Sequence, residues 1–197
     1  MNYMEKLNIK VILGSTRQGR FSEKPGNWIL GELQKRSDVS AELLDLRDYQ
    51  MPFFDEPVSP GYKKEEYKHE AVERWRNKIR EADGFLVISP EYNHGYPAVL
   101  KNAFDYVYPE WNKKAIGFIS YGSAMGARSV EQLRGVAVEL QLAPIRNAIH
   151  MPYDVIVAAG KGTPDAEIFA PYTERATGLI DQLLWWTKAL KTARTAA

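Results

Sequence analysis

The stretch LNIKVILGSTRQGRFS, residues 7–22, decides the fold. It opens with seven mostly apolar residues, Leu7–Leu13, and changes at Gly14 to a turn of glycine, hydroxyl and arginine side chains. A short apolar run that ends at a glycine is typical of a strand. Residues 22–36 follow with apolar side chains at near-helical spacing and with Pro25 in the first turn, which favours a helix. The stretch therefore predicts a strand, a polar loop and a helix in succession.

The same alternation continues along the chain. Apolar runs predict further strands at residues 41–46, 84–89, 114–122 and 144–151. Helical spacing predicts helices at residues 64–82, 97–108, 123–142 and 166–193, with a proline-rich loop at 52–67. Strands that alternate with helices form parallel sheets covered on both faces. We therefore expect one α/β domain over residues 1–197, a three-layer sandwich with a five-stranded parallel sheet in the flavodoxin-like order 2-1-3-4-5.

Composition narrows the function. The net charge is +1, which argues against a nucleic-acid binder that relies on a basic surface. The chain has no cysteine, which excludes disulfides, thiol catalysis and iron–sulfur clusters, so that any redox chemistry needs a non-thiol cofactor. We find no metal-ligand motif. The N-terminus is too polar for a signal peptide, and no apolar run approaches the roughly 20 residues that span a bilayer. We therefore expect a soluble, cytoplasmic protein without membrane partners.

In a sheet of this order, ligands bind beyond the carboxyl ends of the strands, where the strand order reverses. The first loop at that edge, residues 14–22, suits a phosphate group. Ser15 and Ser22 supply hydroxyls, Arg17 supplies a planar fork for phosphate oxygens, and the following helix supplies backbone N–H groups. The alternative is a solvated turn in which Ser22 caps the helix. We expect Arg20 to face solvent more than Arg17, or to meet a second phosphate-bearing substrate.

The second loop begins at residue 89 and should be stiff, because it leaves a buried strand through one proline and enters a helix through another. Tyr92 is placed to cover the face of a planar ring. We expect Glu91 and Asn93 to hold this loop, or the loop of a neighbouring chain, rather than to react. His94 titrates near neutral pH; it either contacts the substrate or is an exposed loop histidine.

The third loop, which begins at residue 120, contains two glycines that permit close approach of the backbone to a ring system. Ser123 is expected to cap the helix that follows. Arg128 stands in the first turn of that helix, where the dipole disfavours a cation. We therefore expect an anionic partner for Arg128, either a phosphate group or, as the structural alternative, Glu131 or a neighbouring chain.

The three loops GSTRQGRFS (14–22), SPEYNHGYPAVLKNAFDYV (89–107) and YGSAMGARSVEQLR (121–134) resemble the signature loops of the NADPH-dependent FMN reductases. This flavodoxin-like family includes quinone, azo-dye and chromate reductases, and the resemblance covers roughly residues 8 to 150. It implies FMN as the bound cofactor and NADPH as the electron donor. The residues that it implies for FMN binding are Ser15, Arg17, Arg20, Phe21, Ser22, Pro90, Glu91, Tyr92, Asn93, Tyr121, Gly122, Ser123 and Gly126. His94 and Arg128 are candidates for substrate binding.

The resemblance also implies a ping-pong mechanism. A hydride passes from NADPH to the flavin N5, NADP⁺ leaves, and a small-molecule electron acceptor takes its place. No side chain needs to act as acid or base, because the cofactor carries the chemistry. Members are commonly homodimers or homotetramers, so residues 104–111 (FDYVYPEW) are either a subunit contact or core packing. Where relatives often have adjacent glycines, this chain has Ala124 and Met125 before Gly126, which would narrow the pocket.

Two other classes remain open. A flavodoxin-like electron carrier would dock on protein partners without NADPH activity, but such carriers are usually strongly acidic, and the net charge and Arg17 argue against one. A flavin-binding regulatory or scaffold protein is compatible with the same loops. A hydrolase on this fold would need a GxSxG elbow, which the sequence lacks.

Overall fold

The computed structural model describes residues 6–196; residues 1–5, part of the polar N-terminal stretch, and residue 197 lie outside it. All five strands are parallel and stand in the order β2-β1-β3-β4-β5, as predicted. The strands are β1 Leu7–Leu13, β2 Val39–Asp45, β3 Gly84–Pro90, β4 Ala115–Tyr121 and β5 Ala143–Met151. The helices are α1 Glu23–Gln34, α2 Glu70–Glu81, α3 Ala98–Asp105, α4 Ala127–Glu139, α5 Tyr153–Gly160, α6 Asp165–Phe169 and α7 Thr173–Thr195, with 3-10 turns at Leu46–Asp48 and Ala170–Tyr172.

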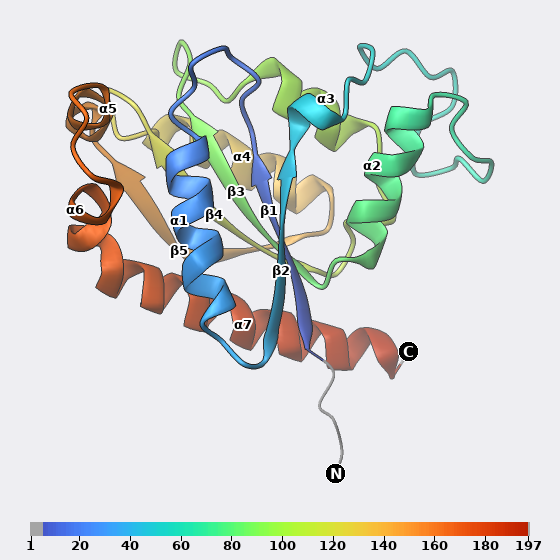
Figure 1. The fold of residues 1–197 in the computed structure, drawn as a ribbon. Helices are drawn as coiled ribbons and strands as arrows, with labels where there is room; N and C mark the ends of the chain where they lie inside the picture. The colour runs from blue at the N-terminus through green and yellow to red at the C-terminus, as the bar shows by residue number, and fades with distance from the viewer. Residues whose placement is uncertain (1–5, 197) are drawn as a thin grey trace.

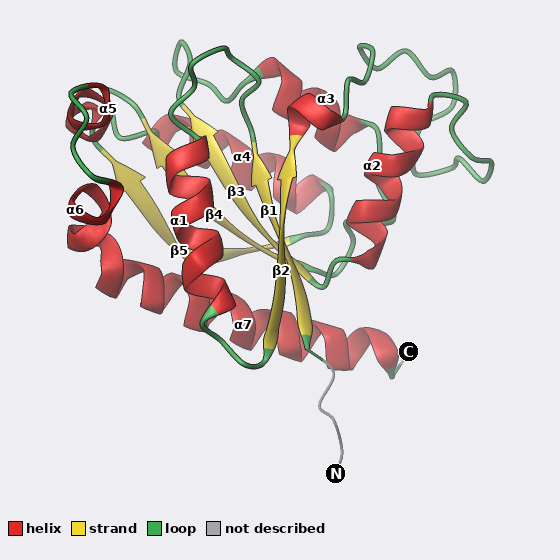
Figure 2. Cartoon of the chain, in the orientation of Figure 1, coloured by secondary structure: helices red, strands yellow, loops and turns green. Residues whose placement is uncertain are grey.

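Helices cover both faces of the sheet, so the molecule has three layers (Figures 1 and 2). The first strand shows how the sequence achieves this. Val11 and Leu13 pack into the core on the side of α1 and α7, whereas Ile12 between them packs on the side of α2, α3 and α4. Strands β3 and β4 are buried along their whole length, which explains their almost continuous apolar sequence.

Two expected helices differ in extent from those observed, and one observed helix was not expected. The helix predicted from residue 64 begins at Glu70, because Tyr67 is buried and donates its hydroxyl to the carbonyl of Tyr106, which holds the preceding segment away from the helix axis. The helix predicted over residues 166–193 is interrupted at Pro171, which has no N–H and restricts the residue before it. Helix α5 was not predicted, since its eight residues form a short apolar run whose periodicity does not separate strand from helix.

The aromatic segment 104–111 belongs to the core. Phe104, Tyr106 and Trp111 are almost completely buried. The ring of Trp111 packs 4.7 Å from that of Phe85 on β3, measured between centroids. Of the two interpretations of this segment, core packing is the one that the structure supports.

A buried lysine ties the sheet to the end of α2. The Nζ of Lys114 donates to the carbonyls of Ile79 (2.7 Å) and Arg80 (3.0 Å) in the last turn of α2, where the carbonyl of Ile79 also accepts from the N–H of Ala82 at 3.3 Å. Burial lowers the pKa of Lys114 to about 8. Above that pH the folded chain releases a proton that the unfolded chain keeps up to its ordinary pKa of 10.5.

We therefore expect Lys114 to make stability rise with pH. In the window between these two pKa values the unfolded state binds more protons, so the free energy of unfolding increases with pH. Urea unfolding measures this free energy. Between pH 7 and pH 9.5 we expect it to increase in the wild type by about 1–2 kcal/mol more than in Lys114→Met. Lys188→Met, at an exposed position on α7, is the control. An equal difference at both pH values would contradict the assignment.

Candidate functional site

The loops that follow β1, β3 and β4 meet at one edge of the sheet, where they enclose a cavity of about 250 Å³. This edge is the point at which the strand order reverses between β1 and β3. The residues that line the cavity come from all three loops and from α5: Arg17, Gly19, Arg20, Phe21, Pro90, Glu91, Tyr92, Tyr121, Gly122, Ser123, Tyr153 and Ile156. Most residues predicted for the site are therefore brought together around one space.

Two hydroxyls at this edge are buried and form no hydrogen bond of good geometry with any described residue, although they lie close to each other. They are Ser22 Oγ, at the start of α1, and the Tyr121 hydroxyl, at the end of β4. An unsatisfied buried hydroxyl costs free energy, so its presence needs an explanation. Ser22 occupies the N-cap position of α1, but its side chain makes no capping bond. Burial raises the pKa of the Tyr121 phenol, which keeps its proton available for donation.

Arg17 is the free cation of the first loop. Its side chain is exposed and forms no hydrogen bond or ion pair within residues 6–196. Its backbone N–H donates to Ser15 Oγ at 3.3 Å. Ser15 Oγ in turn lies 2.9 Å from the Tyr92 hydroxyl, so the first and second loops are joined directly.

Arg20 contradicts the expectation that it faces solvent or a second substrate. Its side chain is buried and donates to both oxygens of Asp45 and, at 3.0 Å, to Glu23 Oε1; it also donates to the carbonyl of Ser15. Burial acts to raise the pKa of Asp45, but the hydrogen bonds and charge of Arg20 outweigh this and lower it. Arg20 therefore fixes the first loop to the end of β2.

The second loop turns back on itself at Asn93 and His94. Tyr92 and Gly95 exchange backbone hydrogen bonds of 2.9 and 3.0 Å, and φ is +50° at Asn93 and +71° at His94. Two consecutive left-handed residues define a type I′ turn, which favours asparagine first and glycine second. A histidine in the second position carries backbone strain. The turn presents the side chains of both residues at the surface.

The anionic partner expected for Arg128 is Glu91. Arg128 Nε donates to Glu91 Oε1 at 2.5 Å, and its backbone N–H donates to Oε2 at 3.3 Å. This ion pair joins the second loop to the third, so Glu91 holds the loops, and the partner of Arg128 within the chain is Glu91 and not Glu131. Arg128 Nη1 also lies 2.9 Å from His94 Nε2. Because an arginine can only donate, His94 Nε2 is the acceptor in this contact.

The third loop is packed tightly against its own strand. Gly126 has φ of +73°, and a Cβ at this position would lie 2.5 Å from the Cβ of Ser120 and 2.7 Å from the backbone nitrogen of Tyr121. Ser120 Oγ donates to the carbonyl of Met125 at 2.9 Å and holds the turn. Gly126, and not Ser123 as expected, is the N-cap of α4; Ser123 is exposed.

Replacing Gly126 by alanine should therefore destabilise the protein by about 2–4 kcal/mol, because the positive φ and the contacts with Ser120 both oppose a Cβ. Urea unfolding measures the change. Gly135→Ala is the matched control, since Gly135 lies within α4 with no atom near its missing Cβ. The control should stabilise by up to about 1 kcal/mol. Similar unfolding curves for the two variants would show that the loop adapts.

Sequence reasoning missed the contribution of α5. Tyr153 and Ile156 line the cavity, and Tyr153 is 54% exposed. On the opposite wall, the ring of Phe21 meets the ring of Tyr121 edge-on at 5.0 Å between centroids. The one available signal was Pro152, which starts α5 as prolines do at helix N-termini.

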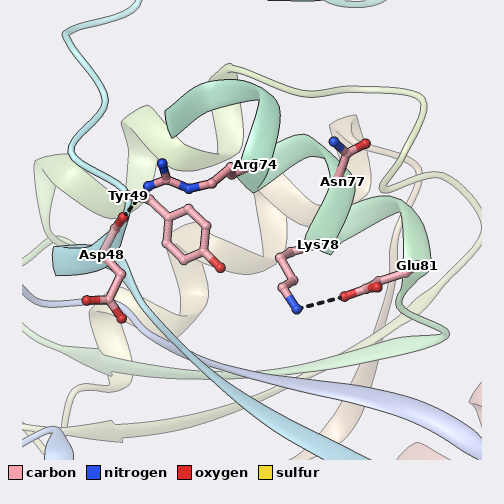
Figure 3. A pocket seen from close by; sticks show the side chains of 6 residues that line it. All are labelled: Asp48, Tyr49, Arg74, Asn77, Lys78 and Glu81. Carbon is pink, nitrogen blue, oxygen red and sulfur yellow. Dashed lines mark hydrogen bonds and ion pairs between the residues drawn. The ribbon is translucent and has the colours of Figure 1, made fainter. Parts of the chain in front are cut away.

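A second hollow lies between α2 and the turn after β2 (Figure 3). Its cationic side chains are already paired: Arg74 lies 3.1 Å from Glu70 and donates to the carbonyl of Asp48 at 2.9 Å, and Lys78 lies 3.2 Å from Glu81 and 2.7 Å from Glu42. None of its lining residues comes from the three loops. We therefore place the functional site at the sheet edge.

Within the described residues, no group of histidine and acidic side chains is arranged to hold a metal ion. Residues 6–196 likewise contain no helix long and apolar enough to cross a membrane.

The parallel sheet has the order 2-1-3-4-5, a loop with hydroxyl and cationic side chains precedes α1, and two further loops line the same cavity, here called the slot. These features define a nucleotide-binding protein of the flavodoxin-like class. Within that class, the chain belongs to the NADPH-dependent FMN reductase family, which residues 7–154 match. This confirms the resemblance predicted from the three loops, together with FMN and NAD(P)H as the cofactors of the family.

Individual relatives agree with the family. The chain is 40% identical over 152 residues to an NAD(P)H-dependent FMN reductase of Schizosaccharomyces pombe, with 76% of each chain covered. It is 35% identical over 104 residues to a quinone reductase of Escherichia coli, covering 52% of this chain and 51% of that protein. A flavoenzyme NAD(P)H:(acceptor) oxidoreductase from Paracoccus denitrificans has the same fold, with a TM-score of 0.70, 21% identity and coverage of 93% and 98%.

Proposed function

We propose that this protein is an oxidoreductase in which bound FMN takes a hydride from NADPH and passes it, in a ping-pong cycle, to a small-molecule acceptor such as a quinone or free flavin. Family membership supports NAD(P)H-dependent flavin and quinone reduction. The observation that carries the assignment of the site is the pair of buried, unpartnered hydroxyls, Ser22 Oγ and the Tyr121 hydroxyl, beside the N-terminus of α1.

These residues fit the phosphate group of FMN. A phosphate monoester needs several donors, and Ser22, Tyr121 and Arg17, which has no side-chain partner within residues 6–196, supply three in one loop system. The start of α1 adds a favourable dipole and the N–H of Glu23, since Lys24 and Gly26 already donate theirs to the carbonyls of Phe21 and Ser22 and Pro25 has none. Arg20 contributes indirectly, since its bonds to Asp45 and Ser15 hold the loop in shape before any ligand arrives.

The second and third loops fit the ring system. Pro90, Tyr92 and Gly122 line the cavity between them, and Ser15 fixes the Tyr92 hydroxyl. The Glu91–Arg128 pair holds the loops at a set separation. When bound, FMN would supply the acceptance and release of hydride. Backbone N–H groups of the third loop other than those of Gly122 and Met125, which donate to the carbonyls of Met151 and Gly122, would be available to negative charge on the ring.

Asn93, Ser123 and Gly126 keep the roles predicted from the resemblance as part of this proposal: Gly126 shapes the third loop, and Ser123 lines the cavity. His94 and Arg128 are bonded to each other at the surface, beside the mouth that a substrate enters. A homodimer or homotetramer, a cytoplasmic location and a single domain over residues 1–197 stay predictions.

One experiment distinguishes an enzyme that turns over NADPH from an electron carrier or a scaffold protein. Protein loaded with FMN is mixed anaerobically with NADPH, and the flavin absorbance near about 450 nm is followed. We expect rapid bleaching and, after a quinone is added, rapid recovery. A band that persists through the addition of NADPH would favour a carrier or a regulatory protein. A failure to bind FMN at all would overturn the site itself.

Ser22→Ala distinguishes a ligand donor from a helix cap. We expect it to leave the stability of the FMN-free protein unchanged or slightly higher, because it removes an unsatisfied buried hydroxyl. We expect FMN affinity to fall at least about tenfold, the loss of one hydrogen bond to a charged group. Urea unfolding and quenching of FMN fluorescence measure the two effects, with the exposed Ser40→Ala as control. Loss of stability with unchanged affinity would restore the capping interpretation.

A further inference from the structure

A third hollow, of about 410 Å³, lies along β5, the strand at one edge of the sheet. Its lining residues are Arg146, Asn147, Ala148 and His150 of β5 with Arg175 and Gly178 of α7. None of them lines the cavity at the three loops, so the two spaces are distinct.

The hollow is positively charged and contains no acid. The side chains of Arg146 and Arg175 make no hydrogen bond or ion pair within the part of the chain that the structure describes. Arg134 stands beside them and donates only to backbone carbonyls, those of Ile145 (2.7 Å) and Arg146 (3.0 Å). Three guanidinium groups thus gather at the end of this strand without a carboxylate to balance them.

The position of Arg175 adds to this imbalance. It lies in the first turn of α7, Thr173–Thr195, where the helix dipole is positive and disfavours a cation. By contrast, the exposed Arg74 and Arg80 each lie near a carboxylate, that of Glu70 at 3.1 Å and that of Glu110 at 3.4 Å. A bound anion would satisfy Arg146, Arg175 and the helix dipole together.

His150 adds a polar side chain to the lining of the hollow. Ser120 Oγ donates to the carbonyl of Met125 at 2.9 Å, so it accepts from His150, whose Nδ1 lies 2.7 Å away. This places the proton of His150 on Nδ1 and leaves Nε2 without a hydrogen bond among the described residues. Burial lowers the pKa of His150; a hydrogen bond with Met125 acts in the opposite direction, and the charges of Arg134 and Arg175 add to the lowering.

From this arrangement we propose that the hollow binds a phosphate-type dianion, held by the forks of Arg146 and Arg175 and reached by His150. Guanidinium forks match tetrahedral oxyanions, and two of them balance a double negative charge. The volume exceeds that of a free phosphate ion, so it also admits a small phosphate monoester. The site does not depend on the redox function proposed above.

The test uses protein loaded with FMN, so that the phosphate-binding donors of the first loop are already occupied. Inorganic phosphate or glycerol 3-phosphate is titrated against the protein at constant ionic strength, and the histidine ring resonances are followed by NMR. His150 is assigned by its loss in His150→Gln. We expect its resonance alone among the three histidines to shift in a saturable way, as an anion raises its pKa.

Arg175→Gln should weaken this binding at least about tenfold. Lys188→Gln, which removes the same charge from an exposed position on the same helix, should leave it unchanged. Retained FMN binding shows that each variant is folded. Tighter binding of glycerol 3-phosphate than of phosphate identifies a monoester as the source, and equal binding identifies the free ion. Either the absence of a saturable shift in the wild type or equal weakening by both substitutions would overturn the proposal.

Discussion

The ion pair between Glu91 and Arg128 is the interaction on which the geometry of the site depends. The parallel sheet brings the ends of β3 and β4 to one edge, but it leaves the loops beyond them free to differ in spacing. The pair spans that gap with a carboxylate that is almost completely buried, and Ser15 joins the first loop to the second through Tyr92. A slot of fixed width results, which is what a flat, rigid cofactor requires.

The arginines of the site fall into two groups, those paired with a carboxylate of the chain and one that is not. Arg20 and Arg128 are bonded to acids and hold the loops, whereas Arg17 has no side-chain partner within residues 6–196 and would be available to a ligand. The proposed site would also account for the unsatisfied hydroxyls of Ser22 and Tyr121. They lower the stability of the ligand-free protein, and the binding of an anion that accepts from them would offset this cost. Trp111 Nε1 and Thr187 Oγ1 are also unsatisfied among the described residues; neither residue lines the cavity at the three loops, and nothing in the structure explains them.

The sequence was sufficient for the sheet and for the location of the site, because strands buried on both faces are continuously apolar and the polar loops follow them directly. It was insufficient wherever a contact joins distant residues. The role of Arg20 is set by Asp45, which lies 25 positions away, and that of Arg128 by Glu91, 37 positions away. Neither pairing leaves a local pattern. Helix α5 was missed for a different reason, since eight residues are too few to show a period.

The edge strand β5 joins the two charged regions of the molecule. Its His150 lies beneath the hollow of Arg146 and Arg175, and it is hydrogen-bonded to Ser120, which holds the carbonyl of Met125 in the third loop. Gly126, the next residue, lies against Ser120 and Tyr121 of β4, where even a Cβ would clash. A change in the charge of His150 must therefore be accommodated by the Ser120 hydroxyl or by the turn at Met125. Because both lie beside the proposed flavin slot, the electrostatics of the β5 edge and the shape of the slot are physically linked.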